Sequence, residues 1–198
     1  MKSKSRILMI AATVTLLLMF AFPLWKITLL APQYPKGIDM FIWINKIKGS
    51  EPGTLQNINI LNHYIGMKPI EPDSIPELQY MQYIVMALAG LAAIFSIINK
   101  WQINLIWAIM LIAAGALAIY DFYLWEYDYG HNLDPSAAII IEGMAYQPPL
   151  IGKKMILNFT AVSLPQLGSI FMALSMASGV AAAFFGRKES KLRIKDAN

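Results

Sequence analysis

Two histidines and a small set of methionines are the residues of this chain best suited to bind a metal. His63 lies in the segment Leu61–Met67, and His131 lies in an acidic, aromatic run that begins at Asp121. Imidazole nitrogen and thioether sulfur, in a chain without cysteine, form a ligand set that suits Cu(I) and tolerates Cu(II). A carboxylate such as Asp128 or Asp134 would orient the His131 imidazole. The methionines in the same polar regions are Met40, Met67, Met144 and Met155.

A simpler interpretation of these residues carries equal weight. Most of the 12 methionines lie in apolar stretches, where this side chain only fills space. A histidine in a loop is more often a hydrogen-bonding residue than a ligand, since metal sites are recognised by converging ligands. Gly66 also weakens the case for one helix that presents both His63 and Met67. The two histidines are about 70 residues apart, so only folding can bring them together.

Other chemistries are excluded by what the sequence lacks. The absence of cysteine removes disulfides, thiolate metal sites, iron–sulfur clusters and cysteine nucleophiles. The sequence contains no Gly-rich phosphate loop after a strand, no HExxH pair and no GxSxG elbow. The apolar stretches lack the repeated charges of a secondary transporter. We therefore expect that the protein is not an enzyme.

Four apolar stretches must position these polar regions, and each is long enough to cross a membrane. They cover approximately residues 7–25, 81–98, 103–124 and 164–185. Only 14% of the residues are charged, against about 25% in a soluble domain. The first stretch follows three bases, as a signal peptide would, but it ends in Phe22-Pro23-Leu24-Trp25 rather than in small residues. We therefore expect a retained anchor and three further spans.

The distribution of charge predicts the orientation of these spans. Nine bases and two acids lie at the termini and in the short link between the second and third spans. The two long loops, together with Asp121 near the outer end of the third span, carry seven bases and ten acids, so the two sets of residues have formal charges of +7 and −3. Because bases collect on the cytoplasmic side, both termini should be cytoplasmic and both long loops extracytoplasmic. The basic residues then serve orientation, and no nucleic-acid partner is expected.

The loops at residues 26–80 and 126–163 are far longer than a helix connection requires. Two β-branched and aromatic runs, residues 26–30 and 40–47, flank a turn rich in proline and glycine. This pattern predicts a short β-hairpin in the first loop. One hairpin beside four spans leaves the predicted fold class all-α. We expect an all-α membrane protein that forms a single membrane domain over residues 1–198.

Four segments carry a resemblance to a known family: APQYPKGIDM, LNHYIGM, DFYLWEYDYGHNLDP and YQPPLIGKKMILNF. They resemble an uncharacterised family of small bacterial four-helix membrane proteins, often encoded near nitrous-oxide reductase and its copper-delivery genes, chiefly in Bacteroidetes-like organisms. The resemblance implies a place in the bacterial inner membrane and a role in copper supply to a respiratory copper enzyme. It also implies His63, Met67, His131 and Met144 as copper ligands. Asp128, which is close to His131 in the sequence, completes the set of candidate metal-site residues.

The leading hypothesis from the sequence is therefore an accessory membrane protein that binds or relays copper on the outer face. Its partners would be the lipid bilayer and a protein of copper-enzyme maturation. The rival is a metal-free scaffold subunit that docks a membrane-complex partner through Glu126, Asp128 and Asp134. A third interpretation is a protein that handles a lipid or another small molecule in a pocket between the loops and the helical bundle.

Overall fold

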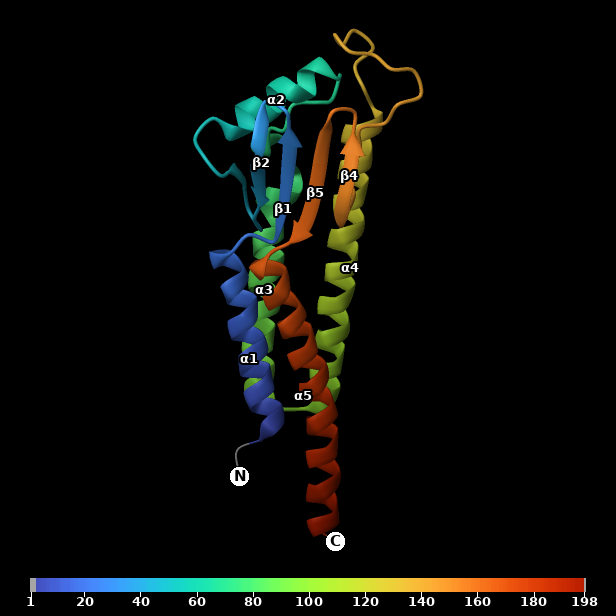
Figure 1. Ribbon diagram of the computed structural model, residues 1–198. Helices are drawn as coiled ribbons and strands as arrows, with labels where there is room; N and C mark the ends of the chain where they lie inside the picture. The colour runs from blue at the N-terminus through green and yellow to red at the C-terminus, as the bar shows by residue number, and fades with distance from the viewer. Residues whose placement is uncertain (1–2, 198) are drawn as a thin grey trace. The chain divides into compact units, whose positions relative to one another are not determined.

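A computed structural model describes residues 3–197 of the chain (Figure 1). Contacts divide these residues into two compact units. The helical unit contains residues 3–22, 80–117 and 167–197, and the sheet unit contains residues 23–79 and 118–166. The helices are α1 (Lys4–Leu18), α2 (Thr54–Tyr64), α3 (Pro76–Ile98), α4 (Trp101–His131) and α5 (Leu167–Ala197). The expectation of a single domain stays a prediction, because contacts do not test whether each unit folds alone.

Four helical segments are long and apolar enough to cross a membrane. They are Lys4–Ala21, Pro76–Ile98, Trp101–His131 and Leu167–Leu192. About 20 apolar residues cross the hydrocarbon core of a bilayer. The lengths and compositions are those of a multi-pass membrane protein. Lys2, one of the bases used to predict the orientation, lies outside the described residues.

Small residues let the helices of the helical unit approach closely. The Ser5 hydroxyl of α1 donates to the carbonyl oxygen of Ala182 on α5 at 2.8 Å, and the Ser175 hydroxyl of α5 donates to Ala12 of α1 at 2.9 Å. Both serine side chains are fully buried. A Cβ atom on Gly179 would lie 2.5 Å from an indole ring of α4. Membrane helices associate through such close contacts because lipid provides no hydrophobic driving force between them.

The sequence prediction of an all-α fold is wrong, because the two long loops form one five-stranded antiparallel sheet. The strands are β1 (Trp25–Ala31), β2 (Tyr34–Ile42), β3 (Ile47–Gly49), β4 (Gly152–Ile156) and β5 (Phe159–Pro165). Their order is β3-β2-β1-β5-β4, so β1 pairs with β2 of the first loop and with β5 of the second. The predicted hairpin exists as β1 and β2, joined by Pro32 and Gln33. A lone hairpin is marginally stable, and the added strands remove this weakness.

The two faces of the sheet differ because side chains alternate along each strand. On the outer face, Lys26 and Thr28 of β1 lie beside Asp39 of β2, with the lysine Nζ 3.6 Å from the carboxylate. The inner face is apolar and buried. Its core residues include Trp25, Ile27, Ile38, Met40 and Ala161.

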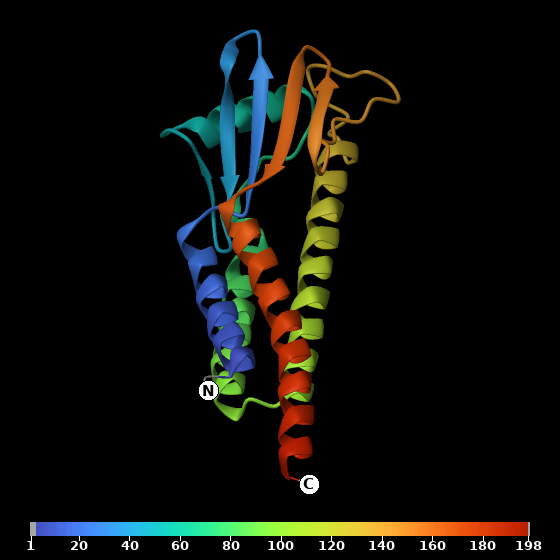
Figure 2. The same cartoon turned by 60° about the horizontal axis from the view of Figure 1, so that its bottom comes forward.

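Helix α2 and the last turns of α4 pack in the sheet unit with this inner face. Ile58 of α2 and Tyr129 of α4 belong to the same buried cluster as Ile27 and Met40. Figure 2 shows α2 running across the strands of the sheet. The space enclosed by these three elements contains the candidate site.

Helix α4 is longer than a membrane crossing requires. Its 31 residues rise about 46 Å, whereas a bilayer core is about 30 Å thick. The segment Trp101–Tyr120 carries no charge, and Asp121 is the first charged residue of the helix. We therefore treat Trp101–Tyr120 as the membrane-spanning segment and Asp121–His131 as its extension. The sequence analysis placed Glu126 at the start of a loop, and the structure places it within this extension.

Candidate functional site

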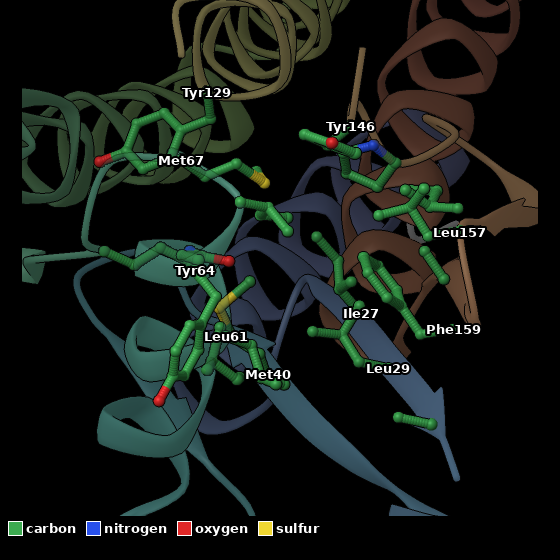
Figure 3. A pocket seen from close by; sticks show the side chains of 18 of the residues that line it. Ile27, Leu29, Met40, Leu61, Tyr64, Met67, Tyr129, Tyr146, Leu157 and Phe159 are labelled. Carbon is green, nitrogen blue, oxygen red and sulfur yellow. The ribbon is translucent and has the colours of Figure 1, made fainter. Parts of the chain in front are cut away.

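A cavity of about 270 Å³ lies within the sheet unit, among the inner face of the sheet, α2 and the end of α4. Its walls consist mainly of aliphatic and aromatic side chains. Figure 3 shows Tyr129 and Tyr146 on one side of the cavity and Leu29 and Met40 on the other. An apolar cavity of about 150 Å³ is enough to bind benzene. This cavity therefore has room for a small apolar molecule.

Strand register positions one wall of the cavity. Ile27, Leu29 and Ala31 alternate along β1 and all line it. Met40 of β2 lies directly opposite Ile27, and Ala161 of β5 lies directly opposite Leu29. These side chains share a face because antiparallel partners project to the same side of a sheet. The wall thus combines residues from both long loops.

Among residues 3–197, Glu126 is the only acidic or basic side chain in the cavity lining. It is 1% exposed, and neither carboxyl oxygen has a hydrogen-bond partner in the described part of the chain. Burial raises the pKa of Glu126 from 4.5 to about 8, because apolar surroundings disfavour the ionised form. Glu126 lies beyond the membrane-spanning segment of α4. The cavity therefore contains a carboxyl group that is mostly protonated at neutral pH.

Tyr146 places another polar group at the cavity, in addition to the side chains of Gln33, Asn62 and Asn158. It is 2% exposed, and its hydroxyl has no hydrogen-bond partner within residues 3–197. The Tyr146 backbone N–H donates to the carbonyl oxygen of Gly130 at 2.9 Å. A Cβ atom on Gly130 would lie 2.4 Å from the backbone nitrogen of Gln147, so only glycine permits this approach. Gly130 lies four residues after Glu126, on the same helix face, which brings Tyr146 within a helical turn of Glu126.

Backbone hydrogen bonds join the segment after α4 to the end of α2. The Asp134 N–H donates to the carbonyl oxygen of Gly66 at 2.8 Å, and the Ile139 N–H donates to Tyr64 at 2.9 Å. Gly66 has a φ of +78°, which a residue with a side chain rarely adopts. A Cβ there would also lie 2.9 Å from the carbonyl oxygen of Asp134. The segment that contains His63 and the segment that follows His131 are therefore side by side.

Of the residues predicted to bind copper, Met67 lines the cavity. His63 is exposed near the end of α2, and Met144 is exposed in the segment after α4. His131 is the last residue of α4 and is also exposed. Its Nδ1 lies 3.0 Å from the carbonyl oxygen of Tyr127, and its ring stacks on the Tyr127 ring with 3.9 Å between centroids. The Nε2 atom is thus the nitrogen of His131 that remains for a metal.

Asp128, the predicted partner of His131, is engaged elsewhere. Its Oδ2 accepts from Lys68 Nζ at 2.7 Å, and its Oδ1 accepts from the Asn132 side chain at 3.3 Å. The hydrogen bond from Lys68 lowers the pKa of Asp128. Hydrogen bonds from Ser136 likewise lower the pKa of Asp134, and the nearby His63 lowers it further.

No three His, Asp or Glu residues form a group that could hold a metal ion within the part of the chain that the structure describes. Methionine sulfur is also a copper ligand, so copper binding by a histidine and methionine set stays a prediction.

The third interpretation from the sequence expected a pocket between the loops and the helical bundle, whereas the residues that line this cavity all belong to the sheet unit. The sequence pattern did not lead to the roles of Glu126 and Tyr146. The sequence analysis treated Glu126 as an exposed docking residue. A signal was present: Phe122, Trp125, Glu126 and Tyr129 recur at helical spacing, and no glycine or proline interrupts them. Continuing the third helix through this pattern would have placed Glu126 on a face with three aromatic residues. Nothing in the local pattern around Tyr146 indicates burial.

No family model matches the chain, and the comparison with curated proteins gives no match.

Proposed function

We propose that the sheet unit of this membrane protein binds a small, largely apolar molecule in its cavity, as a binding protein and not as an enzyme. The observation that carries this proposal is the cavity of about 270 Å³, whose lining is mainly aliphatic and aromatic. Water gains little from apolar walls, whereas an apolar ligand that fills such a space gains dispersion contacts and removes apolar surface from water. The four membrane helices supply an anchor that keeps the binding unit at the bilayer.

Methionine methyl groups offer a direct test. Met40 and Met67 line the cavity, and Met172 and Met176 lie beside Gly115 in the helical unit. We would record ¹³C-methyl methionine NMR spectra of the protein in phosphatidylcholine nanodiscs during a titration with n-octanol. Binding in the cavity predicts saturable shifts of the Met40 and Met67 signals only. Shifts that grow linearly, or that are equal in the helical unit, would mean partitioning into lipid and would refute the proposal.

A cavity-filling variant provides the matched control. Ala161 is fully buried at the cavity wall, so Ala161→Leu should fill part of the space and abolish the saturable shifts. Met155 is 76% exposed on β4, so Met155→Leu should bind as the wild type does. Retained circular dichroism and melting temperature would show that Ala161→Leu is folded. Unchanged octanol binding by that folded variant would place the ligand elsewhere.

We also propose that the sheet unit faces the outside of the bacterial inner membrane, with both termini in the cytoplasm. The excess of bases at the termini supports this orientation. Because the chain has no cysteine, single cysteines can report it. A membrane-impermeant maleimide should label Ser50→Cys in intact spheroplasts and should label Lys188→Cys only after lysis. The reverse pattern would invert the topology.

Copper relay to a respiratory copper enzyme is our second proposal, together with a partner protein that receives the metal. One observation favours it: the backbone hydrogen bonds at Gly66 and Tyr64 join the His63 segment to the segment after His131. Competition titration with a Cu(I) chelator would test it, with His63→Ala/His131→Ala as the variant and Met155→Leu as the control. One-to-one binding that the histidine variant alone loses would support copper. Absent binding, or equal binding in all three proteins, would refute this ligand set.

A further inference from the structure

We propose that the molecule bound in the cavity carries a primary ammonium group, which the Glu126 carboxylate and the Tyr146 hydroxyl hold. This inference rests on the proposed binding of an apolar molecule and assigns the chemical class of that ligand. The ligand would be an amphiphile whose apolar part fills the cavity and whose amine lies at the end of α4.

The first argument is the state of the two polar groups. Glu126 and Tyr146 are 1% and 2% exposed, and three of their side-chain oxygens have no hydrogen-bond partner among the described residues. Buried polar groups in native proteins are nearly always paired, and an unpaired one calls for a specific explanation. Both side chains line one cavity, Glu126 from α4 and Tyr146 from the segment after α4, whose backbone N–H is bonded to Gly130 of α4. A single ligand group can therefore pair with both.

The second argument is the charge of the surroundings. In the part of the chain that the structure describes, the strands and α2 contribute no Asp, Glu, Lys, Arg or His to the cavity lining. The other titratable side chains in the lining are Tyr64, Tyr129 and Tyr146. The Tyr129 hydroxyl already donates to the carbonyl oxygen of Pro69 at 3.2 Å. No cationic side chain of the described cavity lining therefore competes for the Glu126 carboxylate, and a cationic ligand would supply the missing partner.

The third argument is the hydrogen-bonding capacity of the ammonium group. A primary ammonium has three N–H donors and no acceptor. The two carboxylate oxygens of Glu126 and the phenol oxygen of Tyr146 are three acceptors. Above pH 8, where Glu126 is ionised, an alcohol offers only one donor and a ligand carboxylate would be repelled. A primary ammonium group therefore matches the site both in the number of hydrogen bonds and in the sign of its charge.

The volume of the cavity limits the size of the apolar part of the ligand. If 150 Å³ holds the six carbon atoms of benzene, then 270 Å³ holds roughly eleven non-hydrogen atoms. Octylamine has nine, and n-octanol is its neutral counterpart of equal length. This pair of probes differs only in the group that would meet Glu126.

The ionisation of Glu126 predicts a specific pH dependence of octylamine binding. Before the ligand binds, burial holds the pKa of Glu126 at about 8, so the ionised form that pairs with an ammonium is scarce below that pH. An alkyl ammonium, like that of lysine, stays protonated to about pH 10. Octylamine should therefore bind about a hundredfold more tightly at pH 9 than at pH 6. Octanol binding should not rise with pH.

The experiment uses the full chain in phosphatidylcholine nanodiscs and the Met40 and Met67 methyl signals at pH 6 and pH 9. Octylamine and octanol are titrated against the wild type, Glu126→Gln and the control Glu142→Gln, whose side chain is exposed. We expect Glu126→Gln to weaken octylamine binding at pH 9 at least tenfold and to abolish its pH dependence. Octanol binding should change by less than threefold, which also shows that the variant is folded. Glu142→Gln should match the wild type.

The outcomes separate this inference from the proposed function. If neither probe binds the wild type saturably, the proposed function fails. If octanol binds but octylamine has no advantage, or keeps its affinity in Glu126→Gln, the ammonium assignment alone fails. If octylamine binds as expected, nanodiscs in which phosphatidylethanolamine replaces phosphatidylcholine identify the source of the amine. Shifted Met40 and Met67 signals without added octylamine would support a lipid headgroup, and unshifted signals would support a free amine.

Discussion

The variant Glu126→Gln should be more stable than the wild type, and the difference in the free energy of unfolding should grow as the pH rises. Most changes to a buried residue have the opposite effect and lower stability. In the folded chain, burial raises the pKa of Glu126 to about 8 from an ordinary value of 4.5. Below pH 4.5 the group is protonated in both folded and unfolded chains, so it leaves stability unchanged. Between pH 4.5 and pH 8 the folded chain binds the extra proton, so the free energy of unfolding falls as pH rises. Glutamine removes this titration and keeps the shape of the side chain.

The magnitude follows from the two pKa values. Each unit of difference corresponds to about 1.4 kcal/mol, so the wild type should lose about 5 kcal/mol relative to Glu126→Gln once the pH exceeds 8. At pH 7 the difference should be about 3 kcal/mol, and at pH 5 less than about 1 kcal/mol. A loss of this size is a large fraction of the stability of a domain.

Equilibrium unfolding in mixed micelles with sodium dodecyl sulfate, at integer pH values from 5 to 9, would measure the difference. Tryptophan fluorescence would report unfolding of the sheet unit, which contains Trp25, Trp43 and Trp125. The exposed control Glu142→Gln should follow the wild type at every pH. If the wild type and Glu126→Gln gave parallel stability curves across this range, Glu126 would not titrate as a buried carboxyl and the electrostatic argument would be refuted.

Three further predictions concern packing and hydrogen bonding. Gly130→Ala should lower the free energy of unfolding by about 1–3 kcal/mol, because the new Cβ would lie 2.4 Å from the backbone of Gln147. This clash exceeds the gain in helix propensity of about 1 kcal/mol, and thermal melts would measure the loss of stability. A double-mutant cycle with Lys68→Ala and Asp128→Ala should give a coupling of less than about 1 kcal/mol, since the ion pair is exposed, and a larger coupling would contradict this. Trp107→Phe should lower the free energy of unfolding in detergent by about 1–3 kcal/mol, because it removes the indole N–H that donates to a backbone carbonyl of α3 at 2.8 Å. An unchanged unfolding midpoint would contradict this prediction.

The hairpin and the third predicted span show which structural features the local sequence pattern could predict and which it could not. Two runs rich in β-branched and aromatic residues correctly indicated that β1 and β2 pair. The same pattern could not show that β5 pairs with β1, because the two strands are far apart in sequence and either could have had another partner. The third span was predicted to end at Leu124, where apolar residues give way to charge. Tertiary contacts of Trp125 and Tyr129 with the sheet core extend α4 to His131.

The predicted and observed site residues differ for a related reason. His63, His131 and Asp128 attract attention in a sequence because their side chains bind metals, but the structure leaves all three exposed. Glu126 looks like its acidic neighbours in the sequence. Only its position on the inner face of α4 distinguishes it, and that position depends on what packs against the helix.

The amino-acid sequence by itself indicated four helices that are long and apolar enough to cross a membrane, because a hydrocarbon interior requires long stretches with few charges, and a hydropathy profile detects them. Only the tertiary structure decided that, within residues 3–197, the two intervening loops share one sheet and line an apolar cavity with one buried carboxyl group. Strand pairing, burial and the pKa of Glu126 all arise from contacts between residues distant in the chain. Local periodicity and composition do not encode such contacts.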